Sequence, residues 1–133
     1  MILVDTSVLV GYLRGRETEA TGKLDSLERE NAVWAIPAPC VQEILQGALD
    51  EREWRSLHLA VRGRDIVEPV EVVDALVAAA RIWFEARRHG LTIRSATDCL
   101  IAQIALEHDA ILLHDDDDFD RIARVRPLKT LRE

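Results

Sequence analysis

The sequence contains few cysteines, and the two that it has, Cys40 and Cys99, form no recognisable pair. Neither belongs to a Cys-x-x-Cys motif or lies next to a histidine at the spacing of zinc ligands. A disulfide-rich extracellular scaffold and a zinc site of that kind are therefore excluded. We interpret both as small buried residues in a reducing cytoplasm. A reactive thiol is the alternative for Cys99, because the start of a predicted helix can lower the pKa of a thiol.

Long hydrophobic runs are also missing. Hydrophobic residues make up 48% of the chain, but they come in short runs, and none reaches the roughly 18 residues that a membrane-spanning helix needs. The N-terminus lacks the basic region and the long apolar segment of a secretory signal. We therefore expect a soluble cytoplasmic protein with no membrane contact.

Several catalytic motifs are absent as well. The sequence has no Gly-rich phosphate loop, no G-x-G-x-x-G and no G-x-S-x-G motif, which argues against a serine nucleophile. None of the histidines has a partner at metal-ligand spacing, and we interpret each as a surface or core residue: His58, His89, His108 and His114.

Short apolar runs alternate with segments of helical periodicity, which predicts an α/β fold with a central parallel sheet covered by helices on both faces. The chain has 133 residues and no Pro-, Gly- or Ser-rich linker, so we expect a single domain over residues 1–133. The expected strands are Ile2–Val4, Val33–Pro37, Ile66–Pro69, Ala110–Leu113 and Leu128–Leu131.

Helices are expected between these strands, at about residues 8–13, 17–30, 39–48, 54–63, 71–89, 95–105 and 121–123. The helix near residues 71–89 is the longest of them. The apolar residues that we expect on its inward face are Val72, Leu76, Ala79, Ala80, Trp83 and Ala86.

Acidic residues outnumber basic ones by 24 to 17, and the net charge of −7 argues against unspecific binding of nucleic acid. The charge is unevenly distributed, since residues 17–30 are mainly acidic and residues 81–94 are mainly basic, with Arg81, Arg87, Arg88 and Arg94. The basic segment has two interpretations. It is either a rim that holds a polyanion around an acidic site, or a solvated helix face with basic residues near its C-terminus.

Four carboxylates each lie next to an apolar run that could bring them to one edge of the sheet: Asp5, Glu43, Asp98 and Asp116. Ligands of open α/β sheets bind outside the carboxyl ends of the strands. Uncompensated carboxylates repel one another, so a shared hard cation such as Mg²⁺ explains the arrangement. Three of them also have a structural alternative: a helix cap or Asx-type turn for Asp5, a solvated helix face for Glu43, and a Ser-x-x-Asp capping box for Asp98.

The run Asp115–Asp118 allows a calcium loop, a cap for the following helix, or a solvated acidic turn. An EF-hand is excluded, because the sixth position of the run is Asp120 instead of Gly and the twelfth is Arg126 instead of Glu. Four like charges in succession repel one another unless a cation shares them.

Four stretches, in order along the whole chain, resemble the PIN-domain ribonucleases and, among them, the VapC toxins of type II toxin-antitoxin systems. They are Val4-Asp5-Thr6-Ser7-Val8, Gln42–Gly47, Arg94-Ser95 with Asp98–Ala102, and His114-x-Asp116-x-Asp118-Phe119. The resemblance implies a three-layer α/β/α PIN-like fold and a toxic, metal-dependent endoribonuclease. The catalytic and metal-binding residues that it implies are Asp5, Glu43, Asp98 and Asp116.

The resemblance also implies partners and supporting residues. The cofactor would be one or two Mg²⁺ or Mn²⁺ ions, the substrate a structured RNA such as tRNA or an rRNA loop, the inhibitor a small VapB-like antitoxin, and the assembly a homodimer. Thr6 would orient the first carboxylate and Arg94 would steady the acids or a phosphate. Asp118 would lie behind the ligands as a further acid, while Asp115 and Asp117 fall where the family pattern varies.

Two other classes of function are open on the residues alone. One keeps the fold but makes the protein a DNA nuclease or a phosphatase. The short chain without an inserted helical arch argues against a flap-type nuclease, and the lack of a second Asp two residues after Asp5 argues against a dehalogenase-type phosphatase. The other is a non-catalytic or signalling module that gathers acids at strand ends.

Overall fold

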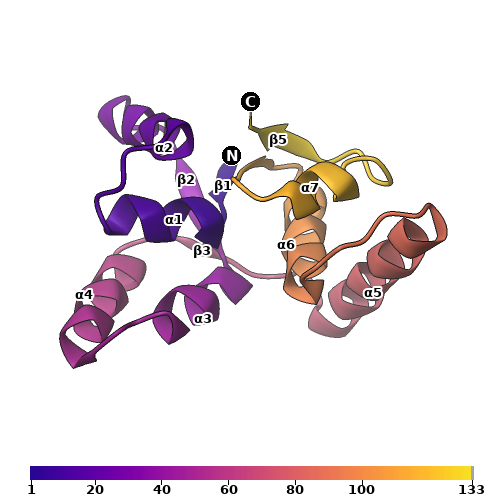
Figure 1. Ribbon diagram of the computed structural model, residues 1–133, viewed down its shortest axis with the longest axis horizontal. Coiled ribbons are helices and arrows are strands. Elements are labelled where there is room, and N and C mark those ends of the chain that lie inside the picture. Colours follow the sequence, from indigo (N-terminus) through magenta and orange to yellow (C-terminus); the bar gives the residue numbers. More distant parts are fainter. Residues whose placement is uncertain (133) are drawn as a thin grey trace.

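A computed structural model describes residues 1–132 as strands and helices that alternate along the chain (Figure 1). The strands are β1 (Ile2–Val4), β2 (Trp34–Pro37), β3 (Ile66–Val67), β4 (Ile111–Leu113) and β5 (Lys129–Leu131). The helices are α1 (Thr6–Leu13), α2 (Glu19–Arg29), α3 (Ala38–Gln46), α4 (Glu51–Arg62), α5 (Val72–Arg88), α6 (Ala96–Glu107) and α7 (Asp117–Ile122). Each predicted strand and helix is present, with ends shifted by a few residues.

The strands form one parallel sheet in the order β3-β2-β1-β4-β5. The chain therefore moves outward from β1 to β3 and then crosses to the other side of β1 for β4 and β5. This reversal places the topological switch point between β1 and β4, where ligands of open α/β sheets bind. Leu3 and Leu112 pair across these strands and are fully buried, which explains why the strands consist of uninterrupted apolar runs.

Helices α1 to α4 lie on one side of the sheet and α5 to α7 on the other, which confirms the predicted three layers (Figure 1). Helix α6 packs against α5, α3 and α7, so it occupies the centre of its layer. Among the described residues, no helix is both long enough and apolar enough to cross a membrane.

The predicted inward face of α5 is partly wrong. The residues of α5 that are buried are Ala75, Ala79, Ile82 and Ala86, whereas Val72 and Leu76 are 58% and 49% exposed. Small alanine side chains let α5 pack closely on α6, the helix with which it has its most extensive contact. The periodicity located the helix correctly, but several of its larger apolar residues, Val72 and Leu76 among them, are exposed.

Candidate metal centre

Asp5 follows β1 directly and is the N-cap of α1. Its Oδ2 accepts hydrogen bonds from the Ser7 backbone N–H, at 2.9 Å, and from the Ser7 hydroxyl, at 2.6 Å. The residue is only 3% exposed. This burial, together with the charge of Asp116, raises the pKa of Asp5 in spite of the bonds from Ser7. The helix cap is therefore present, but it occupies only one of the two carboxylate oxygens.

Glu43 lies on α3 and is held by a hydroxyl group. Its Oε1 accepts a hydrogen bond of 3.0 Å from the Thr6 hydroxyl. Partial burial raises the pKa of Glu43, with further contributions from Asp5 and Asp116 that outweigh the bond from Thr6. The expected role of Thr6 thus needs a correction, because the Thr6 hydroxyl orients Glu43 and the Ser7 hydroxyl orients Asp5. The threonine and serine point to different acids because they are neighbours in the first turn of α1.

Asp98 is the most perturbed acid of the site. It lies in the first turn of α6, is 5% exposed, and its Oδ2 has no hydrogen-bond partner among residues 1–132. The expected capping box is not formed, since the Ser95 side chain makes no capping hydrogen bond. Burial first, and then Asp118, Asp5 and Asp116, raise the pKa of Asp98 to about 9. Without a cation, Asp98 is therefore protonated at neutral pH.

Asp116 follows β4 and is the N-cap of α7. Its Oδ1 accepts a hydrogen bond of 2.9 Å from the backbone N–H of Asp118. The guanidinium group of Arg94 approaches the same carboxylate, with Nη2 3.5 Å from Oδ1. One aspartate of the run therefore caps the following helix, as the sequence allowed, and it lies beside the exposed side chain of Arg94.

Several hydrogen-bond donors surround the carboxylate of Asp118. The Arg94 backbone N–H reaches both carboxylate oxygens at 3.1 and 3.0 Å, and the Ser95 N–H donates to Oδ2 at 3.0 Å. The Arg121 guanidinium adds a contact of 3.2 Å to Oδ1. Burial alone would raise the pKa of Asp118, but these donors and the proton of Asp98 lower it. Asp118 therefore fixes the backbone just before α6, which positions Asp98.

The remaining aspartates of the run, Asp115 and Asp117, pair with Arg132, a residue that the sequence did not indicate as part of this region. Its guanidinium group lies 3.4 Å from Asp115 and 2.7 Å from Asp117, and it also pairs with Asp120. The chain itself therefore supplies a cation that is shared by Asp115 and Asp117. No sequence signal indicates this contact, because Arg132 is 12 to 17 residues from its partners.

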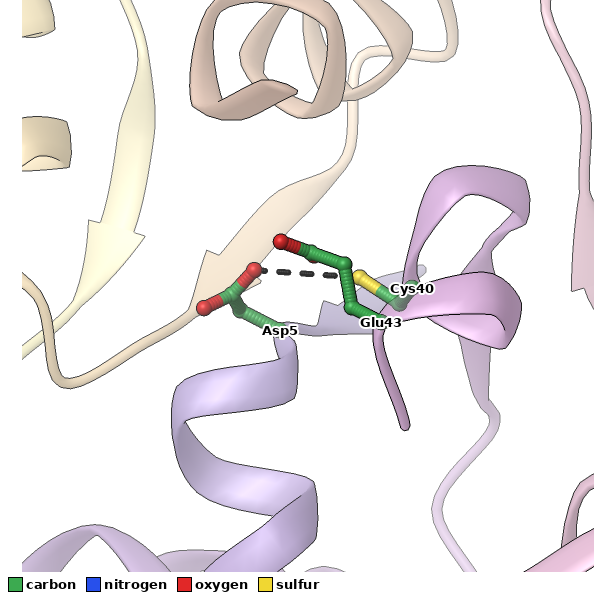
Figure 2. Close-up of side chains that lie close together, drawn as sticks. All are labelled: Asp5, Cys40 and Glu43. Atoms are coloured by element: carbon green, nitrogen blue, oxygen red, sulfur yellow. Dashed lines mark hydrogen bonds between the residues drawn. The ribbon is translucent and has the colours of Figure 1, made fainter. Parts of the chain in front are cut away.

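The acids converge in two groups, in each of which one ligand atom per residue lies within 4.8 Å of the others. The first group is Asp5, Cys40 and Glu43, which point toward one another at the end of β1 (Figure 2). The second is Asp98, Asp116 and Asp118. The raised pKa values show that charges of the two groups act on each other. The oxygen-rich donors and the unpartnered Asp98 Oδ2 fit a hard divalent cation.

The structure also shows where the cysteines and the basic segment lie. Both cysteines are buried, as expected. The reactive-thiol alternative for Cys99 is wrong, because burial and the charges of Asp98 and Asp118 raise the pKa of its thiol to about 11. In the basic segment, Arg81 and Arg88 stack over Phe84 on α5, away from the acids.

Comparisons with known proteins agree with this geometry. The family model of the PIN domain matches residues 2–125. Ribonuclease VapC11 from Mycobacterium tuberculosis (strain ATCC 25618 / H37Rv) is 42% identical over 135 residues, which cover 97% of this chain and 96% of the relative. The chain therefore belongs to the PIN-domain family and, within it, to the VapC ribonucleases.

Solved structures show the same fold. VapBC2 from Rickettsia felis, bound to a DNA fragment from its promoter, superposes with a TM-score of 0.75 at 20% identity and covers 98% of both chains. VapBC-5 from Mycobacterium tuberculosis, described as a member of the VapBC family of toxin-antitoxin systems, gives a TM-score of 0.67 at 17% identity and covers 98% of this chain and 97% of that chain. At these identities, the structures support the fold alone.

Proposed function

We propose that this VapC ribonuclease is a cytoplasmic toxin that hydrolyses RNA phosphodiester bonds with Mg²⁺ or Mn²⁺, and that a small VapB-like antitoxin neutralises it. The residues that would hold the cation are Asp5, Glu43, Asp98 and Asp116. The observation that carries the proposal is the state of Asp98, which is buried, lacks a partner for Oδ2 and has a pKa of about 9. An acid in this state is costly to the metal-free fold, and a bound cation removes that cost.

The chain's own residues position the reaction. A divalent cation, when bound, supplies an activated water and neutralises charge on the scissile phosphate. Ser7 and Thr6 hold Asp5 and Glu43 through hydroxyl hydrogen bonds of 2.6 and 3.0 Å, so both carboxylates are oriented before RNA binds. Asp98 holds a proton in the metal-free site and must release it before its oxygens can act as ligands.

Arg94 is the residue best placed to bind an RNA phosphate. Its side chain is 67% exposed and its guanidinium group lies 3.5 Å from Asp116. A chain with a net charge of −7 repels a polyanion at long range, so a cationic group at the edge of the acids is needed. A planar guanidinium group pairs with phosphate through two parallel hydrogen bonds.

The chemistry of the RNA ends tests the reaction. Direct attack of water on phosphorus leaves a 5′-phosphate and a 3′-hydroxyl, whereas attack by the RNA 2′-hydroxyl leaves a 2′,3′-cyclic phosphate. Mapping RNA ends after brief induced expression would identify the substrate, which we expect to be tRNA or an rRNA loop. Ends that carry 2′,3′-cyclic phosphate would show that the proposed mechanism is wrong.

Growth experiments test the toxin and its partner. Expression of the chain alone should arrest growth, and co-expression of a small adjacent gene for the antitoxin should relieve the arrest. The support is membership of the VapC ribonucleases. Harmless accumulation of folded protein at high level would count against a toxin.

We also propose that the protein forms a homodimer through the outer face of α5. This face carries large apolar side chains that are exposed in the single chain: Val72, Val73, Leu76, Val77 and Phe84. Beside them a hollow of about 430 Å³ lies between α5 and α6, lined among others by Leu76, Trp83 and Leu100. An apolar surface of this extent on a helix indicates an interface.

The charges at the two ends of α5 favour a second copy as the partner. Glu71 and Asp74 lie at its N-terminal end, and Arg87 and Arg88 at its C-terminal end. A two-fold axis across the helix pairs two copies antiparallel, so the acidic end of each meets the basic end of the other. The apolar residues then meet in the middle.

Sedimentation or light scattering tests this assembly with two matched variants. Val77→Asp places a charge within the face and should give monomers, while Val33→Asp changes an equally exposed valine outside it and should leave the dimer intact. A monomeric wild-type chain, or equal effects of both variants, would rule out this face as the interface.

A further inference from the structure

Two guanidinium groups share one carboxylate at the edge of the acid cluster. Oδ1 of Asp118 lies 3.7 Å from Nε of Arg94 and 3.2 Å from Nη1 of Arg121. Arg94 precedes α6 and Arg121 lies on α7, so only the fold brings the two arginines together. The side chain of Asp118 is buried, whereas those of Arg94 and Arg121 are 67% and 35% exposed. The positive charges therefore reach solvent while the carboxylate between them does not.

The carboxylate of Asp118 cannot occupy the donors of both arginines. A carboxylate has about four lone-pair positions, and the backbone N–H groups of Arg94 and Ser95 already donate to both of its oxygens. The guanidinium group of Arg94 forms two ion pairs but no hydrogen bond within residues 1–132. That of Arg121 uses one of its five N–H groups, in the bond to Asp118. Both groups thus retain N–H donors for an acceptor from outside the chain.

Other arginines of the protein are engaged elsewhere. Arg132 pairs with three aspartates of the turn before and within α7. In the basic segment at residues 81–94, Arg81 and Arg88 lie over a phenyl ring on α5, whereas Arg94 contacts the acids. The interpretation of this segment as a rim for a polyanion therefore applies to Arg94, and Arg121 joins that rim from outside the segment.

We infer that Arg94 and Arg121 together bind a single phosphate group of the RNA beside the metal ligands. The identity of this anion rests on the proposed function. Arg94 contacts both Asp116 and Asp118, so a phosphate on the arginine pair lies next to the proposed ligand Asp116. When Asp116 serves a cation, two guanidinium charges face the one charge of Asp118, and the remaining positive charge matches the single negative charge of a phosphodiester. Guanidinium groups also offer phosphate parallel hydrogen bonds.

The salt dependence of RNA binding tests Arg121 without cleavage. The probe is a fluorescently labelled tRNA mixture, with Ca²⁺ in place of Mn²⁺ on the carboxylate oxygens, and electrophoresis afterwards verifies that the RNA is intact. Arg121→Gln should weaken binding about 10-fold and lower the slope of log Kd against log salt concentration by about 0.7 to 0.9. The matched control, Arg55→Gln, removes an exposed arginine of α4, on the opposite side of the sheet from α7, and should change neither value.

A double variant tests whether the two arginines bind the same phosphate. If they do, Arg94→Gln combined with Arg121→Gln should weaken RNA binding by less than the product of the two single losses. A loss equal to that product would mean two separate contacts and would overturn the shared site. Arg121→Lys keeps the charge beside Asp118 but lacks the planar fork of donors, so it should bind RNA several-fold more weakly than the wild type.

Mn²⁺ binding separates this role from a purely structural one. Arg121→Gln should keep the Mn²⁺ affinity of Arg55→Gln, because the backbone N–H groups of Arg94 and Ser95 still hold Asp118. Loss of Mn²⁺ affinity together with RNA affinity would show that Arg121 serves only to hold Asp118, and the inference would be wrong. NMR of the wild type gives a readout that needs no variant, since the guanidinium Nε–H signals of Arg94 and Arg121 should shift when RNA is added.

The remaining outcomes distinguish the inference from the proposed function. RNA affinity that is unchanged in Arg121→Gln, or lowered equally in Arg55→Gln, would overturn the inference even if the protein cleaves RNA in Mn²⁺. Binding that depends on Arg94 and Arg121, in a protein that does not cleave RNA in Mn²⁺, would leave the arginine pair standing and refute the proposed function.

Discussion

The acids at the carboxyl edge of the sheet fall into two sets with opposite electrostatic character. In the first, burial and mutual repulsion raise the pKa values of Asp5, Glu43 and Asp98. In the second, Arg132 lowers the pKa of Asp117, and backbone N–H groups lower that of Asp118. Density of negative charge is therefore a poor guide to a metal site. What distinguishes the first set is the lack of a sufficient counter-charge supplied by the chain.

The two sets differ because of where their members come from. Asp5, Glu43 and Asp98 begin or lie on helices that meet at the switch point between β1 and β4. The ion pairs of Arg94 in this region are with Asp116 and Asp118. In the second set, Asp117 is exposed and pairs with Arg132, which follows β5. Asp118 is buried and accepts hydrogen bonds from the backbone N–H groups of Arg94 and Ser95.

Removing one charge from each set should give the largest difference in RNA cleavage between two variants. Asp98→Asn keeps the shape of the side chain but removes a ligand charge, so RNA cleavage should fall by more than about 100-fold. Asp117→Asn, an equally isosteric change in the second set, should alter the rate of RNA cleavage by no more than about twofold. Single-turnover cleavage in Mn²⁺, with circular dichroism to confirm folding, measures both. Equal losses in the two variants would show that the sets do not differ.

Metal should stabilise the fold through the proposed ligands and not through Asp117. At a free Mn²⁺ concentration of 100 times Kd, binding adds about 2.7 kcal/mol to the free energy of unfolding, which should raise Tm by several degrees. Thermal melts with Mn²⁺ and with EDTA measure the difference. Asp98→Asn should lose this response, and Asp117→Asn should keep it. Identical midpoints in Mn²⁺ and EDTA for the wild type would contradict the shared-cation site.

The raised pKa of Asp98 predicts how pH acts on the metal-free protein. The folded chain keeps a proton up to a pKa of about 9 that the unfolded chain releases near 3.8. The free energy of unfolding should therefore fall with rising pH, relative to Asp98→Asn, by up to about 1.4 kcal/mol per pH unit between about pH 5 and about pH 8. Urea unfolding of both proteins at several pH values measures it.

The same proton links pH to metal binding. Because Asp98 must lose a proton to bind a cation, Mn²⁺ affinity should rise with pH by up to about 10-fold per pH unit over the same range. A pH-independent affinity in the wild type would mean that Asp98 is already ionised or is not a ligand. Isothermal titration in buffers of different ionisation enthalpy would count the released protons directly.

The smallest expected effect concerns the counter-charge of the second set. Arg132→Ala should return the pKa of Asp117 toward its ordinary value, because the bond from Arg132 is the main cause of its lowering. NMR titration of the aspartate carboxyl carbons measures this shift, and Mn²⁺ binding should change little. If Arg132→Ala instead abolished Mn²⁺ binding, the turn that carries Asp117 would have to be part of the metal centre.

The sequence by itself determined the order of strands and helices, the parallel sheet and the positions of four acids at strand and helix ends. Those features follow from local patterns, since apolar runs and helical periodicity are set by neighbouring residues. It also showed which acids could meet, because the carboxyl ends of parallel strands lie at one edge of the sheet. The resemblance to VapC ribonucleases rested on the same local stretches.

Only the tertiary structure decided which acids have partners. It paired Arg132 with Asp117 and the Thr6 hydroxyl with Glu43, and it brought Cys40 to Asp5. It also left Oδ2 of Asp98 without a hydrogen-bond partner in the part of the chain that the structure describes. It also buried three alanines of α5 together with Ile82 and left several larger apolar residues of this helix exposed. Hydrogen bonds and ion pairs act over less than about 4 Å, and the residues that come this close can be many positions apart in the chain. Sequence spacing therefore places an acid at the site, but the surrounding packing determines whether that acid is free to bind a cation.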